Sequence, residues 1–196
     1  GDSGNLVLVE ECLRGEEASI LALVDGERIV TLASSQDHKR VFDGDTGPNT
    51  GGMGAYCPVS LATPELLARV RREVFEPTLR EMMSRRTPYQ GVLYAGLMIQ
   101  PDGALSVLEF NCRFGDPETQ PLMARLGSDL LPFLVGAAEG KLPAEPLRWA
   151  AGAALCVVLA AEGYPGRYRK GVPIEGLAPT AAEDGLIAFH AGTATD

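Results

Sequence analysis

Two apolar runs around a Pro-Asp-Gly turn constrain the fold more than any other feature of this sequence. The runs are residues 91–100, GVLYAGLMIQ, and residues 104–111, ALSVLEFN. Pro-Asp-Gly is a turn sequence, and the second run alternates between apolar and polar side chains as a strand does. The two runs therefore predict an antiparallel β-hairpin.

The second run ends in a dense group of charged and amide side chains. Within the stretch LEFNCRFGDPET these are Glu109, Asn111, Arg113, Asp116 and Glu118. Because side chains two apart on a strand share a face, Glu109 and Asn111 lie together, and Arg113 joins them if the strand continues. The opposite face is expected to pack against the apolar core through Leu108, Phe110 and Cys112. The strand is thus predicted to have one apolar face packed against the core and one polar face, called the chemical face below, that carries Glu109 and Asn111.

A carboxylate and an amide oxygen on one face can both reach one hard cation. Magnesium prefers oxygen ligands and usually keeps waters and substrate phosphates in its shell. Glu109 and Asn111 therefore predict a magnesium site completed by phosphate oxygens. Arg113 could neutralise phosphate or grip a carboxylate, and Asp116 could hold an ammonium group. The alternative is a solvated strand end with ordinary surface ion pairs.

Upstream of the hairpin, the sequence predicts a three-stranded antiparallel meander and a long loop. The strands are expected at residues 5–13, 17–26 and 27–36, with a hairpin turn at LRGEE and a turn at Asp25-Gly26. Residues 37–59 contain five glycines and little hydrophobic periodicity. A loop of this length is usually functional or disordered.

Three segments have helical patterns. Residues 63–86 begin with Thr63-Pro64, a good N-cap and first-turn pair, and Pro77 is expected to kink or break this helix. Residues 117–127 predict a second helix. Residues 128–142 predict a third, capped by Ser128 and ended by Gly140.

From about residue 146 the sequence pattern changes from helical segments to short predicted strands and turns. The sequence there reads AAGAALCVVLAAEGYPG after a Pro-containing segment. We therefore expect a domain boundary near residues 143–150, dividing the chain into residues 1–143 and 144–196. Because the chain does not begin with Met and runs almost at once into a strand, we also expect it to be a piece of a longer protein.

Charge and cysteine content narrow the classes of partner and compartment. A net charge of −9 argues against nucleic acid or an anionic membrane as the main partner. No apolar run approaches the ~20 residues of a membrane span. The four cysteines form no C-x-x-C pair, which argues against a zinc site. They predict reduced, mostly buried thiols in the cytosol, at Cys12, Cys57, Cys112 and Cys156.

The stretch VEECLRGEEAS resembles the adenine-and-ribose segment of the ATP-grasp superfamily. In that superfamily a Glu near a strand end and a hydrophobic residue three positions later bracket adenine, and a Glu after the turn binds the ribose hydroxyls. The resemblance implies these roles for Glu10, Leu13 and Glu17, respectively. LEFN resembles the metal-binding strand of the same superfamily. There is no GK[ST] sequence, so the glycine-rich stretch is not a Walker P-loop.

Longer motifs resemble the phosphoribosylamine–glycine ligase family. They are SQDHKRVFDGDTGPNTGGMGAY, YAGLMI and EFNCRFGDPETQP, and AAEGYPGRYRKG is similar to the start of the family's C-terminal domain. The implied fold is α+β: the C-terminal part of an ATP-grasp domain, with an antiparallel sheet and helices, followed by the beginning of a small β-rich domain. The glycine-rich stretch would contact substrate phosphate through Lys39, Arg40, Asn49, Gly51 and Gly52.

The resemblance implies an ATP-dependent ligase of purine biosynthesis in the cytoplasm. ATP, glycine and 5-phosphoribosylamine would be its substrates and Mg²⁺ or Mn²⁺ its metal, with Glu109 and Asn111 as metal ligands and Arg113 and Asp116 as the catalytic pair that holds glycine. Other enzymes of purine biosynthesis are possible partners, whereas no nucleic-acid or membrane partner is expected.

Two departures from the wider superfamily qualify this expectation. Leu97 stands where many ATP-grasp enzymes carry a further metal carboxylate, and the family's N-terminal domain and lid subdomain have no counterpart in these 196 residues. The alternatives are therefore another ATP-grasp carboxylate–amine ligase, or a nucleotide-binding fragment that is inactive by itself.

Overall fold

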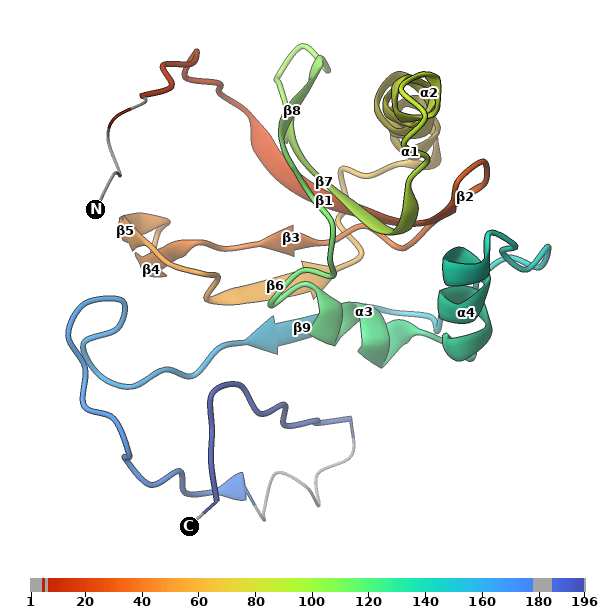
Figure 1. Cartoon of the computed structure of the whole chain (residues 1–196). Coiled ribbons are helices and arrows are strands. Elements are labelled where there is room, and N and C mark those ends of the chain that lie inside the picture. The colour runs from red at the N-terminus through yellow and green to blue at the C-terminus, as the bar shows by residue number, and fades with distance from the viewer. Residues whose placement is uncertain (1–4, 6, 178–184, 196) are drawn as a thin grey trace.

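The structure, a computed structural model, describes residues 5, 7–177 and 185–195. It has the predicted α+β architecture, with antiparallel sheets and a few helices. A four-stranded sheet has the order β2-β1-β7-β8, a three-stranded sheet has the order β3-β6-β9, and β4 and β5 form a separate ribbon. Figure 1 shows the two larger sheets as successive layers, with the ribbon at one end of them.

The four-stranded sheet forms the centre of the fold. Its strands are β1 (Glu16–Asp25), β2 (Ile29–Thr31), β7 (Gln90–Ile99) and β8 (Leu105–Asn111). The predicted hairpin is confirmed, because β7 and β8 pair in antiparallel fashion around the Pro-Asp-Gly turn. The turn at Asp25-Gly26 is also confirmed, since it joins β1 to β2.

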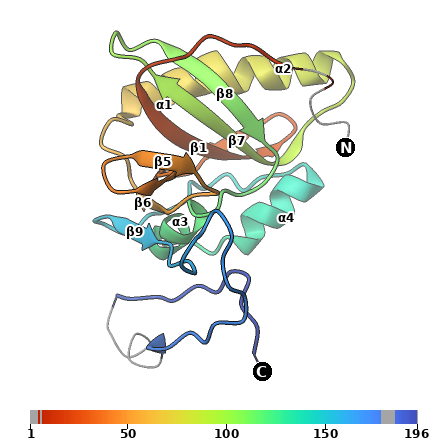
Figure 2. The same cartoon turned by 90° about the vertical axis from the view of Figure 1, so that its left-hand side faces the viewer.

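One face of this sheet is covered by a long helical segment, which Figure 2 shows crossing the strands. It consists of α1 (Pro64–Val70), a π-helical segment η1 (Arg71–Phe75) and α2 (Glu76–Ser84). The buried residues of this interface include Ile20 and Leu97 from the strands. Their removal from water is a main source of the stability of this layer.

The ends and the irregularity of this segment follow from its sequence. Thr63 caps it as predicted, and its Oγ1 accepts a hydrogen bond from the Leu66 N–H. Pro77 lies in the first turn of α2, and the five residues before α2 are π-helical. The chain therefore stays helical through Pro77, with an altered hydrogen-bonding pattern just before it.

The other face of the sheet packs against α3 (Thr119–Arg125) and α4 (Leu131–Glu139). Gly140 ends α4 in the left-handed conformation, with φ of 74°, as predicted. The predicted cap of α4 was wrong. Asp129 Oδ1 accepts the Leu131 N–H, whereas the Ser128 hydroxyl accepts the N–H of Arg148. The acidic side chain lies one position nearer the first turn and so reaches its free N–H.

The glycine-rich stretch is not a structureless loop, so that prediction was wrong. It forms β3 (Gln36–Asp37), β4 (Arg40–Phe42), β5 (Thr46–Asn49) and β6 (Gly54–Cys57). The strand partner of β6 is β9 (Ala154–Val157), about a hundred residues later in the chain. Local periodicity cannot reveal such a partner, which explains the error. The third predicted strand, at residues 27–36, is divided between β2 and β3.

The apolar run at the N-terminus was also predicted wrongly. Within residues 5–13, excluding residue 6, which lies outside the described residues, no strand forms. The side chains of Val7, Leu8 and Val9 are 72–88% exposed. The predicted hairpin with β1 would need a free edge on β1. That edge is taken, because β7 pairs with all of β1 on one side, and β2 and Ser35 pair with it on the other.

The outer face of β8 is less buried than expected. Leu108 and Phe110 are about 40% exposed, and Cys112 is exposed. The reason is that β8 is the edge strand of its sheet and has a neighbour on one side only. The prediction of mostly buried thiols was wrong as well. All four thiols are free, but only Cys57 is buried.

β9 follows the predicted domain boundary and pairs with β6, and the boundary itself stays a prediction. No further strand follows β9 in residues 158–177 or 185–195, which lie beyond β9 in Figures 1 and 2. None of the helices in the described part of the chain is both long enough and apolar enough to cross a lipid bilayer.

Candidate functional site

Strand register gathers polar side chains on the face of the central sheet that is turned away from α1 and α2. Ser19 on β1 lies opposite Gly96 on β7, which lies opposite Glu109 on β8, and Tyr94 lies opposite Asn111. Because a strand repeats every two residues, these side chains point to the same side of the sheet. The predicted chemical face therefore exists and extends over three strands.

Glu109 and Asn111 share this face as predicted. The Asn111 side-chain amide donates a hydrogen bond of 3.2 Å to Glu109 Oε1. This contact leaves the amide oxygen of Asn111 and the second carboxylate oxygen of Glu109 available to a ligand. Gly96 lies opposite Glu109 and has no side chain to crowd it, whereas a Cβ at this position would lie 3.4 Å from Glu109 Cγ.

Lys39 brings positive charge to the same face. Its Nζ donates to Glu17 Oε2 at 2.7 Å and lies 3.7 Å from Asp37 Oδ2. Burial favours the neutral amine, but Glu17, Asp37 and Glu109 together outweigh burial and raise the pKa of Lys39. Lys39 is therefore held as an ammonium group among carboxylates.

Asp37 was not predicted as a site residue. Its side chain is only 6% exposed. Burial raises its pKa, and the nearby Glu118 and Glu17 raise it further, although Lys39 acts in the opposite direction. A buried carboxyl group crowded by other carboxylates is common at functional sites. Its position two residues before Lys39 was the available sequence signal.

A buried hydroxyl–carboxylate network lies beneath this charged cluster. Glu118 Oε1 accepts a hydrogen bond of 3.1 Å from the Ser19 hydroxyl and a short one from the Tyr94 hydroxyl. Burial raises the pKa of Tyr94, and so does the hydrogen bond to Glu118. Sequence reasoning noticed the charge of Glu118 but gave it no role, and it missed Ser19 and Tyr94.

The glycine-rich segment reaches the site through Gly52 rather than through free N–H groups. The N–H of Gly51 donates to the Tyr164 hydroxyl at 3.3 Å, and that of Gly52 donates to Thr50 Oγ1 at 3.0 Å. Gly52 has φ of +127°, and a Cβ there would overlap Pro117. The glycine is required because the backbone passes directly against the stretch that follows Asp116.

Arg40 and Asn49 lie opposite each other on the β4–β5 ribbon, and both are exposed. The Arg40 guanidinium donates to the carbonyl of Gly47 at 2.6 Å. The ribbon therefore brings these two predicted phosphate ligands together, but the described hydrogen bonds and ion pairs do not connect them to Lys39's carboxylate partners.

Arg113 and Asp116 follow β8 and are exposed. Arg113 donates to the carbonyl of Phe114 at 2.8 Å, and Asp116 Oδ1 accepts from the Gln120 amide at 2.7 Å. Neither forms a described hydrogen bond or ion pair with Glu109 or Asn111. Gln120 therefore orients Asp116, and Arg113 is held only by the carbonyl of the next residue among the described hydrogen bonds and ion pairs.

Glu10 is exposed and Leu13 is half-buried, both in the segment that forms no strand. Among the hydrogen bonds and ion pairs of the described residues, none links Glu10 to the site. Of the three residues predicted to bind nucleotide, only Glu17 is placed by the central sheet.

The described residues contain no group of three or more His, Cys, Asp and Glu side chains arranged to hold a metal ion. Leu97 is fully buried on the helix-covered face of the sheet, so this position contributes nothing to the chemical face. A metal bound here would have Glu109 and Asn111 as its protein ligands. A two-ligand set of oxygen donors fits a hard cation that keeps phosphate and water in its shell.

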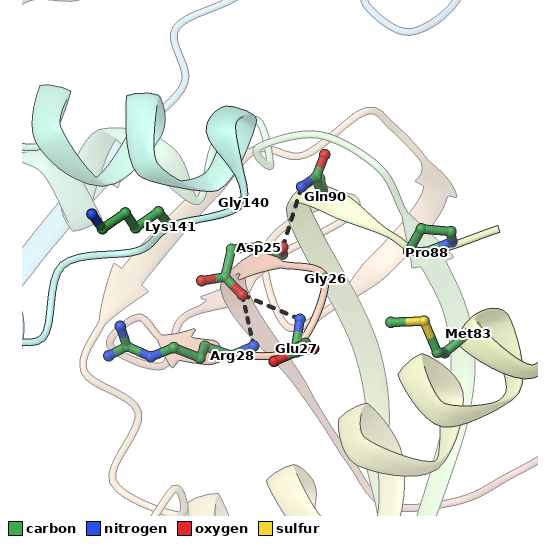
Figure 3. Close-up of a pocket in the computed structure, with 9 residues that line it drawn as sticks. All are labelled: Asp25, Gly26, Glu27, Arg28, Met83, Pro88, Gln90, Gly140 and Lys141. Carbon is green, nitrogen blue, oxygen red and sulfur yellow. Dashed lines mark hydrogen bonds between the residues drawn. The ribbon is translucent and has the colours of Figure 1, made fainter. Parts of the chain in front are cut away.

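A cavity of about 340 Å³ lies at the far end of β1, beside the β1–β2 turn (Figure 3). Asp25 is one of the residues that line it and is 7% exposed. Its carboxylate accepts the N–H groups of Glu27, Arg28 and Leu142 at 2.7–3.2 Å. Burial works against ionisation, but these hydrogen bonds outweigh it and lower the pKa of Asp25. Its acceptors are used by the backbone, which indicates a structural tie.

Comparison with protein families gives two matches. Residues 1–119 match the ATP-grasp (A) domain of phosphoribosylglycinamide synthetase, and residues 154–196 match the C domain of the same family.

Individual relatives agree with these matches. The chain is 55% identical over 195 residues to a phosphoribosylamine–glycine ligase of Vibrio cholerae, covering all of this chain and 45% of the relative. A second ligase with this name, from Pseudomonas aeruginosa, is 55% identical over 194 residues and is again covered to 45%. The chain therefore spans about half the length of the relatives it matches.

Solved structures show the same pattern. The crystal structure of phosphoribosylamine–glycine ligase from Thermotoga maritima matches 90% of this chain and 46% of its own, with a TM-score of 0.75 and 39% identity. The ATPase subunit of phosphoribosylaminoimidazole carboxylase from Aquifex aeolicus has a TM-score of 0.52 at 17% identity, over 80% of this chain and 42% of its own. This second likeness concerns the fold alone.

Proposed function

The chain belongs to the phosphoribosylglycinamide synthetase family, and from that premise we propose that it carries part of the active site of a phosphoribosylamine–glycine ligase. The proposed reaction joins glycine to 5-phosphoribosylamine and converts ATP to ADP and phosphate, giving glycinamide ribonucleotide. One observation carries the proposal: a single sheet face holds Glu17, Lys39, Glu109 and Asn111 in a chain that matches both domains of the family.

The nucleotide side of the site is proposed to be built on Glu17 and Lys39. Their 2.7 Å ion pair occupies the carboxylate that would bind the ribose hydroxyls. ATP would therefore have to exchange this pair for two new ones, ribose on Glu17 and phosphate on Lys39. The raised pKa of Lys39 keeps its amine protonated at neutral pH, as phosphate binding requires.

The metal side is proposed to be Glu109 and Asn111, which would hold Mg²⁺ or Mn²⁺. Bound there, the ion would neutralise charge on the triphosphate during phosphoryl transfer. The protein groups would mainly position the reactants, because phosphoryl transfer needs little covalent participation by side chains.

Asp116 is proposed to hold the glycine ammonium and Arg113 its carboxylate. A carboxylate oxygen of glycine then bonds to the γ-phosphorus of ATP while the bond between that phosphorus and the β,γ-bridging oxygen breaks. The products of this step are ADP and glycyl phosphate. The amine of phosphoribosylamine next attacks the glycyl carbonyl carbon, the bond to phosphate breaks, and the amine loses a proton to water.

The 196 residues by themselves are proposed to bind ATP weakly and to form no product. Glu10 and Leu13, the proposed adenine residues, lie in a segment without strand partners. With water in the site, every charge interaction is weaker than in an enclosed pocket. Calorimetric titration with a non-hydrolysable ATP analogue tests this, and micromolar affinity would contradict it.

A chimera tests the function itself. In it, this chain replaces the matching segment of the Vibrio cholerae ligase, to which it is 55% identical. We expect release of ADP that requires both glycine and phosphoribosylamine, and the unmodified relative is the matched control. Turnover with other amino acids but not with glycine would favour a different ATP-grasp carboxylate–amine ligase. A folded chimera without turnover would favour an inactive nucleotide-binding module.

A further inference from the structure

Glu118 is buried where the two central strands meet the beginning of α3. It is 2% exposed, and its hydroxyl partners Ser19 and Tyr94 are 2% and 5% exposed. The two hydroxyl oxygens are 2.7 Å apart, and both groups donate to Glu118 Oε1. Since an unsatisfied buried carboxylate is unfavourable, these two hydroxyls fix where the Glu118 side chain can lie.

The same side chain fixes the turn that contains Asp116. Glu118 folds back over Gly115, where a Cβ would overlap the second carboxylate oxygen. Within the turn, the Thr119 hydroxyl donates to the carbonyl of Gly115 at 2.5 Å and its N–H donates to the same oxygen at 3.3 Å. The turn is therefore compact and is tied to β1 and β7 through Glu118.

The tie continues from this turn to the glycine-rich segment. Pro117 packs directly against Gly52, whose N–H is held by the Thr50 hydroxyl, and Thr50 in turn donates from its N–H and hydroxyl to the carbonyl of Lys39. Lys39 binds Glu17 on β1, two residues from Ser19. A closed ring of contacts thus begins and ends on β1 and connects the turn that contains Asp116 to Lys39 and Glu17.

We propose that Glu118 is a positioning residue for the amino-acid substrate. It acts by holding the Gly115–Glu118 turn, and with it the Asp116 carboxylate, in fixed relation to the strands that carry Glu109 and Asn111. The ligand it serves is a small zwitterionic α-amino acid, which needs an anion for its ammonium at a defined place. This inference rests on the proposed function, because Asp116 is the group proposed to bind glycine.

Tyr94→Phe in the chimera tests the tie most selectively, because only one hydroxyl is removed. We expect KM for glycine to rise about five- to tenfold, the size of effect that the loss of one ordinary hydrogen bond gives, because Ser19 still donates to Glu118. KM for ATP should stay within about twofold, since Glu17 and Lys39 keep their own pairing. The matched control is Thr78→Val, which also removes one half-buried hydroxyl: it donates to the carbonyl of Val74 in the helical segment that covers the opposite face of the sheet.

Two substitutions of Glu118 distinguish a role as hydrogen-bond acceptor from a role of its negative charge. Glu118→Gln keeps an oxygen that both hydroxyls can reach, so we expect KM for glycine within about threefold of the parent. Glu118→Ala removes the acceptor, and we expect an increase of about tenfold or more. Amide exchange at Thr119 should quicken in Glu118→Ala and stay slow in Glu118→Gln.

Several results would overturn the inference. They are an unchanged KM for glycine in Tyr94→Phe or Glu118→Ala, an equal rise in the KM values for glycine and ATP, and a Glu118→Gln variant as impaired as Glu118→Ala. A variant that only destabilises the fold would have a lower melting temperature, and below that temperature its KM values for all three substrates would be unchanged. This result also counts against the inference. An inactive parent chimera is a different outcome, because it contradicts the proposed function before any variant is compared.

Discussion

A buried aspartate side chain lies near each end of β1, Asp25 at the end of the strand itself and Asp37 on the neighbouring β3, yet their surroundings differ in kind. At one end Asp25 receives three backbone N–H groups, and these lower its pKa although burial opposes them. At the other end Asp37 lies beside Glu17 and Glu118, with Lys39 as a cation 3.7 Å away, and burial and its neighbours raise its pKa.

The difference distinguishes a structural carboxylate from a functional one. A carboxylate that already accepts three backbone N–H groups has little capacity left for a ligand, and it stabilises the fold. Carboxylates that crowd around one lysine repel one another. A bound cation or a new hydrogen-bond donor reduces this repulsion, so such a cluster can gain free energy by binding a ligand. Accordingly, the cavity beside Asp25 in Figure 3 belongs to the scaffold, and the chemistry is proposed for the Glu17 end.

The largest effect on stability is expected at Asp25. Asp25→Asn places an amide donor against backbone N–H groups, and we expect a loss of about 2–3 kcal/mol in the free energy of unfolding of the 196-residue chain at pH 7. Asp37→Asn, the same change at the other end, should leave stability equal or higher, because it removes a crowded charge. Urea denaturation measures both, and equal losses would end the distinction between the two aspartates.

The pH dependence of these variants should have opposite signs. The folded pKa of Asp25 is lowered, so its stabilisation is present above the ordinary value of 3.8 and is lost as pH falls through the folded pKa. Asp25→Asn and the parent should therefore converge in acid.

For Asp37 the folded pKa is raised above 3.8, so its protonated form contributes fully below that value and the contribution is lost as pH rises through the folded pKa. The advantage of Asp37→Asn should accordingly grow between pH 3 and pH 7. Denaturation curves at several pH values measure this. An advantage that shrinks over the same range would contradict the raised pKa.

The smallest expected effect concerns the ion pairs. Lys39→Met should cost about 1 kcal/mol at pH 7, because it removes the cation that pairs with Glu17 and Asp37 and that lies near Glu109. The reference is Arg85→Ala, which breaks a pair with Glu81 of the same 2.7 Å length but 72% and 60% exposed. That change should cost about 0.3 kcal/mol. Equal costs for both would show that the cluster at Glu17 is an ordinary solvated surface.

The sequence alone was sufficient to predict those strands whose pairing partners are close in the chain. The β7–β8 hairpin places Glu109 and Asn111, and local alternation was sufficient to predict their common face. The run at residues 5–13 has a similar apolar pattern, but both edges of β1 are occupied, so the predicted hairpin with β1 does not form. Periodicity shows that a segment can be a strand, whereas it does not show whether the expected partner strand has a free edge.

The site residues that sequence missed depend on distant contacts. Ser19 and Glu118 are 99 positions apart and Tyr94 and Glu118 are 24 apart, so no local pattern could connect them. The same holds for β6, whose partner β9 lies about a hundred residues away. The roles predicted for individual residues stay predictions, because position on a common face does not by itself establish what each side chain binds.

The central proposal is that the chemical face of β8 takes part in the proposed reaction and the Asp25 end does not, and kcat of two chimera variants tests it most directly. Glu109→Ala should lower kcat by ~10²–10³ with saturating Mg²⁺ while the melting temperature stays close to the parent's. Asp25→Asn should lower the melting temperature and leave kcat unchanged below it. A Glu109→Ala chimera with near-parental turnover at saturating Mg²⁺ would contradict the account.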